Sequence, residues 1–260
     1  SHVSVPVTRH WRIANGELQG AVFYSTYNSG LADVGGAIMR VPLGGSFEPV
    51  KGQTGSDAST KCTVCHSVSA NGKVLVAAIG WSEEPNGKNP GNPLDSASFD
   101  VSSAGVASQR KLEKSLGRKF AFGALTPDGT WMVTNGVPDV PLDQPRVRGL
   151  SGYDPDENDS LVIDAQLSVF IDTSSGTAVD VPSFTDRVKQ ALTPQFSPDG
   201  SALAFSWYDD SPGRTLAVAS VQGTQSPPEV GSVDAVLRSD SEVLAWPSFT
   251  PDSKALLFHA

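Results

Sequence analysis

Three residues in one short segment have the types and spacing for cofactor chemistry. Residues 62–66 are Cys-Thr-Val-Cys-His, and Cys62 and Cys65 are the only cysteines among the 260 residues. C-x-x-C-H is the attachment signature of c-type haem, in which two thiols bond covalently to the porphyrin and the adjacent histidine ligates the iron. The segment therefore predicts that Cys62 and Cys65 anchor a haem c and that His66 is the proximal iron ligand.

Two other chemistries use the same residue types. A C-x-x-C pair forms a local disulfide or a redox dithiol in many proteins, with His66 then a bystander. A structural zinc site normally needs four ligands, usually as two separated pairs, and the sequence has no second Cys/His pair. The disulfide stays open as the alternative to haem, and zinc is disfavoured.

The sequence does not determine a second axial ligand for such an iron. The other histidines and methionines are His2, His10, His259, Met39 and Met132. The two methionines lie in apolar, strand-like segments, where methionine usually fills the core. An open sixth position and a ligand supplied from elsewhere are further alternatives.

Other candidate sites carry weaker signals. Asp154–Asp159 places oxygen ligands at alternate positions, as a calcium loop does, but Asp159 stands where an EF-hand has glycine and Ala165 where it has glutamate. A solvated acidic loop is favoured, with calcium as the alternative. No G-x-S-x-G elbow and no G-x-x-x-x-G-K-[ST] phosphate loop occur. An enzyme with its active site in a central funnel is a further alternative, but no set of catalytic residues in the sequence specifically supports it.

The segment that follows the cysteine motif is typical of a β-strand, whereas a small cytochrome has a helix there. The turn signal Asn71-Gly72 precedes the valine-rich run Lys73–Ala78. The motif is therefore expected at the entrance to β-structure.

A turn followed by a strand-like run occurs four times. The turns are Ser69–Gly72, Thr126–Gly129, Ser197–Gly200 and Thr250–Ser253. Proline presets φ at the first central position, and Asp-Gly makes the tight reversal into a strand. A strand running into a glycine turn also recurs later in each unit, and the intervals suit four short strands with loops. The repeats predict an all-β fold, a β-propeller of four-stranded blades, with a β-sandwich of similar hairpins as the alternative.

The turn Ser197-Pro198-Asp199-Gly200 and its following strand resemble the TolB-like propeller repeat, which is related to WD-type blades. The likeness extends over nearly the whole chain and implies a rigid platform, which says little about chemistry. The motif at Cys62–His66 also resembles exported bacterial propeller proteins whose blades carry C-x-x-C-H-S before a Ser-x-Asp-Gly turn, although Asn71 replaces the aspartate. The resemblance implies that residues just before each turn form an innermost strand. It places Cys62, Cys65 and His66 at one end face, near the axial funnel. Alignment of the four turns makes His66 equivalent to Gly123, Pro194 and Pro247 in the other units.

We expect one propeller domain across residues 1–260. Its units are about 11–61, 62–120, 121–190, 191–245 and 246–260. A last blade cut ten residues after Thr250 has an open edge. The expectation is an incomplete propeller, truncated at the C-terminus, of about four blades plus the start of another. Further sequence or another chain would complete it, and closure by N-terminal strands is the alternative.

Charge and hydropathy restrict the partners. A net charge of −9 argues against nucleic acid, and no apolar stretch is long enough to span a membrane. Attachment of haem c takes place outside the cytoplasm, so the motif implies a periplasmic or extracellular protein. The sequence thus predicts an exported β-propeller with one covalent haem c, acting in electron transfer or as a redox scaffold with a protein partner. The alternative is a haem-free periplasmic or surface interaction module with a Cys62–Cys65 disulfide.

Overall fold

The protein is represented by a computed structural model. The structure describes residues 20–27, 29, 36–51, 63–79, 95–102, 109–110, 118–119, 123–134, 137–138, 168–208, 213–222 and 227–260. Cys62, His2, His10 and the acidic segment Asp154–Asp159 lie outside these ranges. The predictions made for them are therefore not addressed by the fold.

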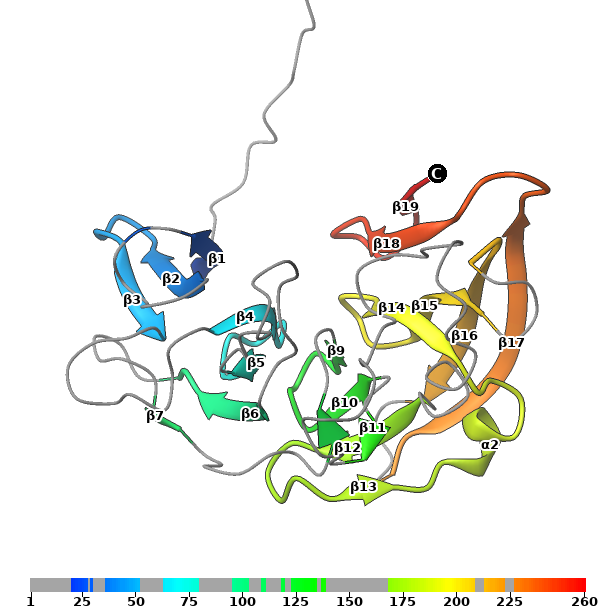
Figure 1. The fold of residues 1–260 in the computed structure, drawn as a ribbon, viewed down its shortest axis with the longest axis horizontal. Coiled ribbons are helices and arrows are strands. Elements are labelled where there is room, and N and C mark those ends of the chain that lie inside the picture. Colours follow the sequence, from blue (N-terminus) through cyan, green and yellow to red (C-terminus); the bar gives the residue numbers. More distant parts are fainter. Residues whose placement is uncertain are drawn as a thin grey trace, which may run out of the picture.

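The described strands form antiparallel sheets arranged in an arc, with the first strand of each sheet nearest the centre (Figure 1). The first sheet contains β1 (Ala21–Tyr27), β2 (Gly36–Pro42) and β3 (Glu48–Lys51). The second contains β4 (Thr63–Val68), β5 (Val74–Ile79), β6 (Asp95–Asp100) and β7 (Gln109–Arg110). The third contains β9 (Gly123–Leu125), β10 (Trp131–Thr134), β12 (Val169–Asp172) and β13 (Ala178–Val179).

The C-terminal half continues the same order. The fourth sheet contains β14 (Ala191–Phe196), β15 (Ala202–Trp207), β16 (Thr215–Gln222) and β17 (Glu229–Arg238). The fifth contains β18 (Ala245–Phe249) and β19 (Leu256–His259). A short pair, β8 (Arg118–Lys119) and β11 (Val137–Pro138), is separate from these sheets. We call the five sheets blades 1 to 5 in chain order.

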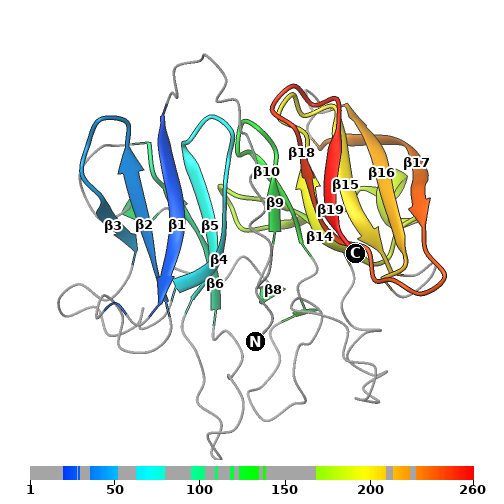
Figure 2. The same ribbon diagram turned by 90° about the horizontal axis from the view of Figure 1, so that it is seen from above.

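This architecture confirms the predicted all-β propeller of four-stranded blades. Blades 2, 3 and 4 each have four strands in the described ranges, and each repeated turn joins the first strand of its blade to the second. Seen from above, the blades stand side by side from the N-terminal to the C-terminal half (Figure 2). In Figure 1 the arc is open between β1 and the pair β18–β19.

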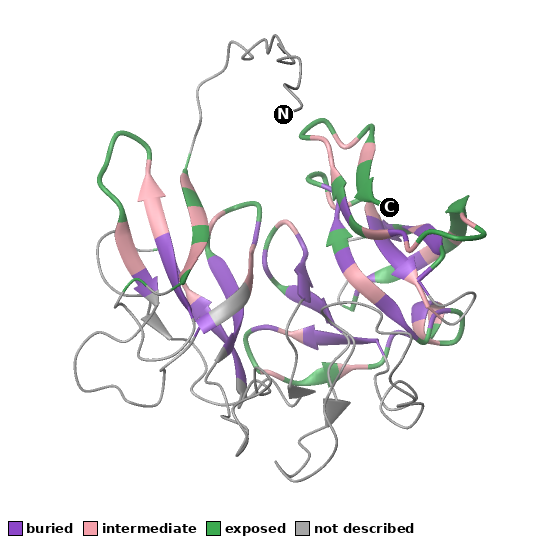
Figure 3. Ribbon diagram, turned by 45° about the horizontal axis from the view of Figure 1, so that its top comes forward, coloured by how far each residue is buried: buried purple, intermediate pink, exposed green. Residues whose placement is uncertain are grey.

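Each core lies between two neighbouring blades, because alternate residues of a strand point to opposite faces of its sheet. Leu75 and Ala77 of β5 pack against blade 1, whereas Val74 and Val76 pack against blade 3. Buried residues gather in these interfaces, and exposed ones increase toward β1 and β19 (Figure 3). Position in the strand therefore decides which neighbour a side chain contacts.

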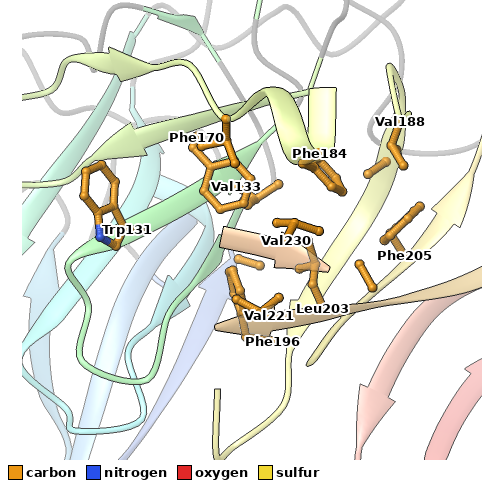
Figure 4. Packing of buried hydrophobic residues seen from close by; sticks show 14 of the residues in the cluster. Trp131, Val133, Phe170, Phe184, Val188, Phe196, Leu203, Phe205, Val221 and Val230 are labelled. Atoms are coloured by element: carbon orange, nitrogen blue, oxygen red, sulfur yellow. The ribbon is translucent and has the colours of Figure 1, made fainter. Parts of the chain in front are cut away.

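The largest core joins blades 3 and 4 and includes a helical turn that the sequence did not predict. In α2 (Pro182–Thr185), Phe184 lies edge-on to Phe170 and Phe205, with ring centroids 5.6 Å and 5.8 Å away (Figure 4). Pro182 is at a helix start, where its missing N–H costs nothing. The turn thus adds one aromatic ring to a sheet-to-sheet interface.

Hydrogen bonds stabilise each repeated turn internally and also connect neighbouring turns. In every turn the first hydroxyl bonds the Asx side chain two residues later, as Ser197 Oγ does with Asp199 Oδ1 at 2.7 Å. Neighbouring turns also bond: Asn71 Nδ2 donates to the Asp128 carbonyl at 2.8 Å, and the Asp199 amide donates to Ser253 Oγ at 3.2 Å. The turns therefore link blade 2 to blade 3 and blade 4 to blade 5 at the same end of the strands.

Candidate functional site at the first strand of blade 2

The cysteine motif enters β4, the innermost strand of blade 2. Cys62 lies outside the described ranges, and of Cys65 only the backbone is described, as part of β4. His66 is the one motif residue whose side chain the structure describes, and it is half-buried. The end of the motif is thus part of the strand itself.

Cys65 and His66 form a β-bulge. Val64 pairs with Ala78 and Ser67 pairs with Val76, so the two residues between them lie opposite Ala77 alone. A bulge bends its strand and redirects a side chain. The side chain of His66 therefore does not follow the regular alternation of side chains between the two faces of β4.

The same bulge recurs in the innermost strands of two other blades. It contains Thr193 and Pro194 in β14, and Trp246 and Pro247 in β18. Thr193 and Trp246 have positive φ angles of 45° and 55°, the left-handed backbone that non-glycine residues rarely adopt. The predicted equivalence of His66 with Pro194 and Pro247 is confirmed, whereas Gly123, the third predicted equivalent, begins β9 and pairs with Thr134 in regular register.

Blade 2 therefore has an imidazole where blades 4 and 5 have proline. Proline suits this position because a bulge leaves a backbone N–H outside the ladder. Histidine at the same place keeps the bulge and adds a group that donates or accepts a hydrogen bond and binds metals. The exchange of residue type is specific to the blade that carries the cysteines, as far as the described bulges show.

The ring of His66 is directed at β1 of blade 1. Its Nδ1 lies 3.2 Å from Ser25 Oγ, and the ring also hydrogen-bonds the backbone of Phe23. Burial lowers the pKa of His66 below its ordinary value, and the bond with Phe23 opposes this effect only in part. The imidazole is therefore neutral at neutral pH, which is the form that binds a metal.

The residue after His66 contacts the opposite neighbour. Ser67 Oγ donates a short hydrogen bond to the carbonyl of Gly123 in β9. A Cβ at Gly123 would lie 2.8 Å from Met132 Sδ, so any larger residue there would have to displace the Met132 side chain. The strand β4 is thus held from both sides, by blade 1 through His66 and by blade 3 through Ser67.

A buried hydroxyl in the motif has no partner among the described residues. Thr63, directly after Cys62, is fully buried, and its Oγ1 makes no hydrogen bond with the part of the chain that the structure describes. Buried polar atoms are nearly always paired, by protein, water or a bound group. The start of β4 therefore has unused hydrogen-bonding capacity beside the first cysteine.

These residues fit a haem c site in three respects. His66 is neutral, its Nδ1 has a partner that orients the ring as second-shell groups orient metal-bound histidines, and Cys65 immediately precedes it in the bulge. Within the described ranges no three His, Cys, Asp or Glu side chains are grouped as metal ligands would be. The fit thus concerns a porphyrin held by the motif, with one protein ligand described.

The candidate second ligands are not brought to His66 by any described contact. Met39 and Met132 are buried, and Met132 belongs to the core between blades 2 and 3. His259 ends β19 in blade 5 and is exposed. Ser25 and Phe23, which do contact His66, were missed in the sequence because no local pattern links His66 to Ser25, 41 residues earlier, or to a residue still farther away.

Comparison with solved structures identifies the fold. TolB from Acinetobacter baumannii superposes with a TM-score of 0.52 at 17% identity, over 91% of this chain and 45% of that protein. The chain has the fold of a TolB-like β-propeller. A TolB-type protein from Agrobacterium tumefaciens gives a TM-score of 0.46 at 17% identity, over 85% of this chain and 62% of that one. The chain thus spans roughly half the length of the first of these proteins, and likeness at such identity concerns the fold alone.

Sequence comparisons add no family. No family model matches the chain, and no curated protein matches it. None of the helices in the described part of this TolB-like chain has the length and apolar character that a membrane crossing requires.

Proposed function

We propose that the chain is an exported TolB-like β-propeller module that carries one haem c and serves in electron transfer or as a redox scaffold. The observation that carries the proposal is His66: the blade with the C-x-x-C-H motif replaces the bulge proline with a neutral histidine whose Nδ1 is bonded to a neighbouring blade. A bystander histidine needs neither the bulge position nor the adjacent cysteines.

The chain's residues have separate roles in this proposal. Each thiol of Cys62 and Cys65 adds across one vinyl group, with its sulfur bonded to carbon and its hydrogen transferred to the same double bond, so attachment needs no oxidant. His66 would hold the iron through Nε2, because its Nδ1 lies within hydrogen-bond distance of Ser25 Oγ. The haem, when bound, supplies a one-electron couple. The bulge and the contact of His66 with blade 1 limit movement of the ligand.

Export follows from this proposal, because haem c is attached outside the cytoplasm. The partner would be a redox or scaffold protein that docks on the propeller. The acidic net charge of −9 favours a partner with a basic docking surface.

Further propeller blades, from the same polypeptide or from a partner chain, would cover the exposed faces of the end blades. Leu257 of β19 occupies the position of Val76 and Ala204, which are fully buried by the following blade, yet it is 65% exposed. On the free side of blade 1, Val22 is 48% exposed. An additional blade on these faces would slow amide hydrogen exchange in β19, and unchanged exchange on mixing with the partner would contradict this part of the proposal.

The strand context favours one alternative, a haem-free interaction module. Here a Cys62–Cys65 disulfide would pin the entry into β4, since the motif lies in a strand and not in a helix. Expression in the periplasm with a c-type haem maturation system separates the two. Haem attachment gives a Soret band and a reduced α-band that persist in denaturant, and Cys62→Ser with Cys65→Ser removes them. A colourless wild-type protein that lacks free thiols would establish the disulfide instead.

A further inference from the structure

The contact between His66 and Ser25 joins two different blades. Ser25 is in β1 of blade 1, His66 is in β4 of blade 2, and both side chains are half-buried. A neutral imidazole has one N–H, so the pair exists in two forms. Either Nδ1–H donates to Ser25 Oγ, or the serine hydroxyl donates to Nδ1 and Nε2 carries the proton. Only the first form leaves the Nε2 lone pair for a metal.

Resting on the proposed function, we infer that Ser25 is a positioning residue that tunes the haem iron from blade 1. It accepts a hydrogen bond from Nδ1–H of His66, fixes the ring orientation and selects the tautomer whose Nε2 binds iron. Accepting that bond also makes the imidazole a stronger electron donor, as second-shell acceptors do for metal-bound histidines. A stronger donor favours ferric over ferrous iron and lowers the midpoint potential.

The geometry makes the serine more than a packing residue. Ser25 pairs with Ile38 of β2, whose side chain is in the core between blades 1 and 2, so Ser25 presents its hydroxyl to that same interface. Phe23, two residues earlier and thus on the same face, packs against this core, and its backbone carbonyl also accepts a hydrogen bond from the His66 ring. In the tautomer that leaves Nε2 free, Ser25 and Phe23 share the single Nδ1–H. Blade 1 therefore supplies both groups that hold the ring.

A matched set of variants tests the inference on the full chain loaded with haem. Ser25→Ala removes the acceptor, and Ser25→Thr keeps a hydroxyl. Ser67→Ala is the control, because the hydroxyl of Ser67 also makes a hydrogen bond from β4 to a neighbouring blade, but to the Gly123 carbonyl and not to the imidazole. If Ser25 has a merely structural role, Ser25→Ala and Ser67→Ala should both change thermal stability, and the midpoint potential of the iron should be the same in the two variants.

The expected result is a rise in midpoint potential for Ser25→Ala only. A tenfold loss in the ligand's preference for ferric iron, the lower end for outer-shell substitutions, equals about 59 mV for a one-electron couple. Ser25→Thr should recover most of this shift, and Ser67→Ala should show none. A potential for Ser25→Ala equal to that of Ser67→Ala would overturn the role of Ser25 while haem attachment stands. Wild-type protein without haem would instead overturn the proposed function.

Discussion

Asn71→Asp tests whether the repeated turns hold the blades together. Three of the four turns have aspartate at this position, and in each the side chain accepts bonds within its own turn. Asn71 Oδ1 accepts equivalent bonds, from Ser69 Oγ at 2.7 Å and the Lys73 amide at 3.0 Å. Aspartate would keep both acceptor functions. It would lose only the donor Nδ2, which bonds the Asp128 carbonyl of blade 3 at 2.8 Å.

The substitution should therefore cost about 1 kcal/mol of the free energy of unfolding. One lost hydrogen bond contributes about 0.5–1.5 kcal/mol. The new carboxylate would also repel the Asp128 carbonyl, but this cost is small because the site is exposed to solvent. For a chain of this size, that corresponds to a fall in Tm of about 2–4 °C. Urea denaturation at neutral pH measures the free energy, and a thermal melt gives the Tm.

The matched control is Asp199→Asn in blade 4. The Asp199 side chain bonds Ser197 and the amide of Ser201 within its turn, and it is the backbone amide that reaches Ser253 of blade 5. At neutral pH the control should lose only the stabilisation that the ionised carboxylate gives its own turn, and it should keep the bond to blade 5. If Asn71→Asp is as stable as the wild type, Asn71 is only a tolerated exchange and the turns do not couple the blades through this side chain.

Two more predictions concern the same turns. Hydrogen bonds from Ser201 and Ser197 lower the pKa of Asp199 to about 2, below its value in the unfolded chain. The stabilisation they give is therefore complete above about pH 4 and is lost as the pH falls toward 2. In acid titrations monitored by circular dichroism, Asp199→Asn should flatten the decline of stability, and an unchanged slope would contradict this prediction. Gly129→Ala should lower the free energy of unfolding in urea by about 2–4 kcal/mol, because φ is +78° and the new Cβ would lie 2.7 Å from Val74 Cγ2. Gly72→Ala, with φ +67° and open space around the Cβ, should lower it by only about 1 kcal/mol. Equal losses in the two variants would refute the contribution of the steric clash.

Local chemistry made the fold predictable from the sequence. Pro-Asp-Gly turns act within four residues, so Ser197–Gly200 indicated a strand on each side, and its recurrence indicated blades. Alignment on the turns also gave the equivalence of His66 with Pro194, which the bulges confirm. Even the helical turn α2, which was missed, has only a proline at its start as a local signal.

Contacts between blades could not be predicted in this way. The sequence showed only that Asn71 replaces the aspartate of the turn pattern, but its amide reaches Asp128, which is 57 positions away. The Ser25 contact with His66 depends on how two sheets face each other, and neither residue has a local pattern that points to the other. Residue types and spacing identified the candidate chemistry, and only the packing of blades showed what holds it.

The mass of one peptide tests the central claim most directly. Trypsin cleaves after Lys61 and Lys73, so residues 62–73 form one fragment that contains both cysteines and His66. From protein matured in the periplasm, the account predicts this fragment with one haem bonded through both sulfurs and no thiol left to alkylate. The bare fragment, either two hydrogens lighter as a disulfide or alkylated at Cys62 and Cys65, would contradict it.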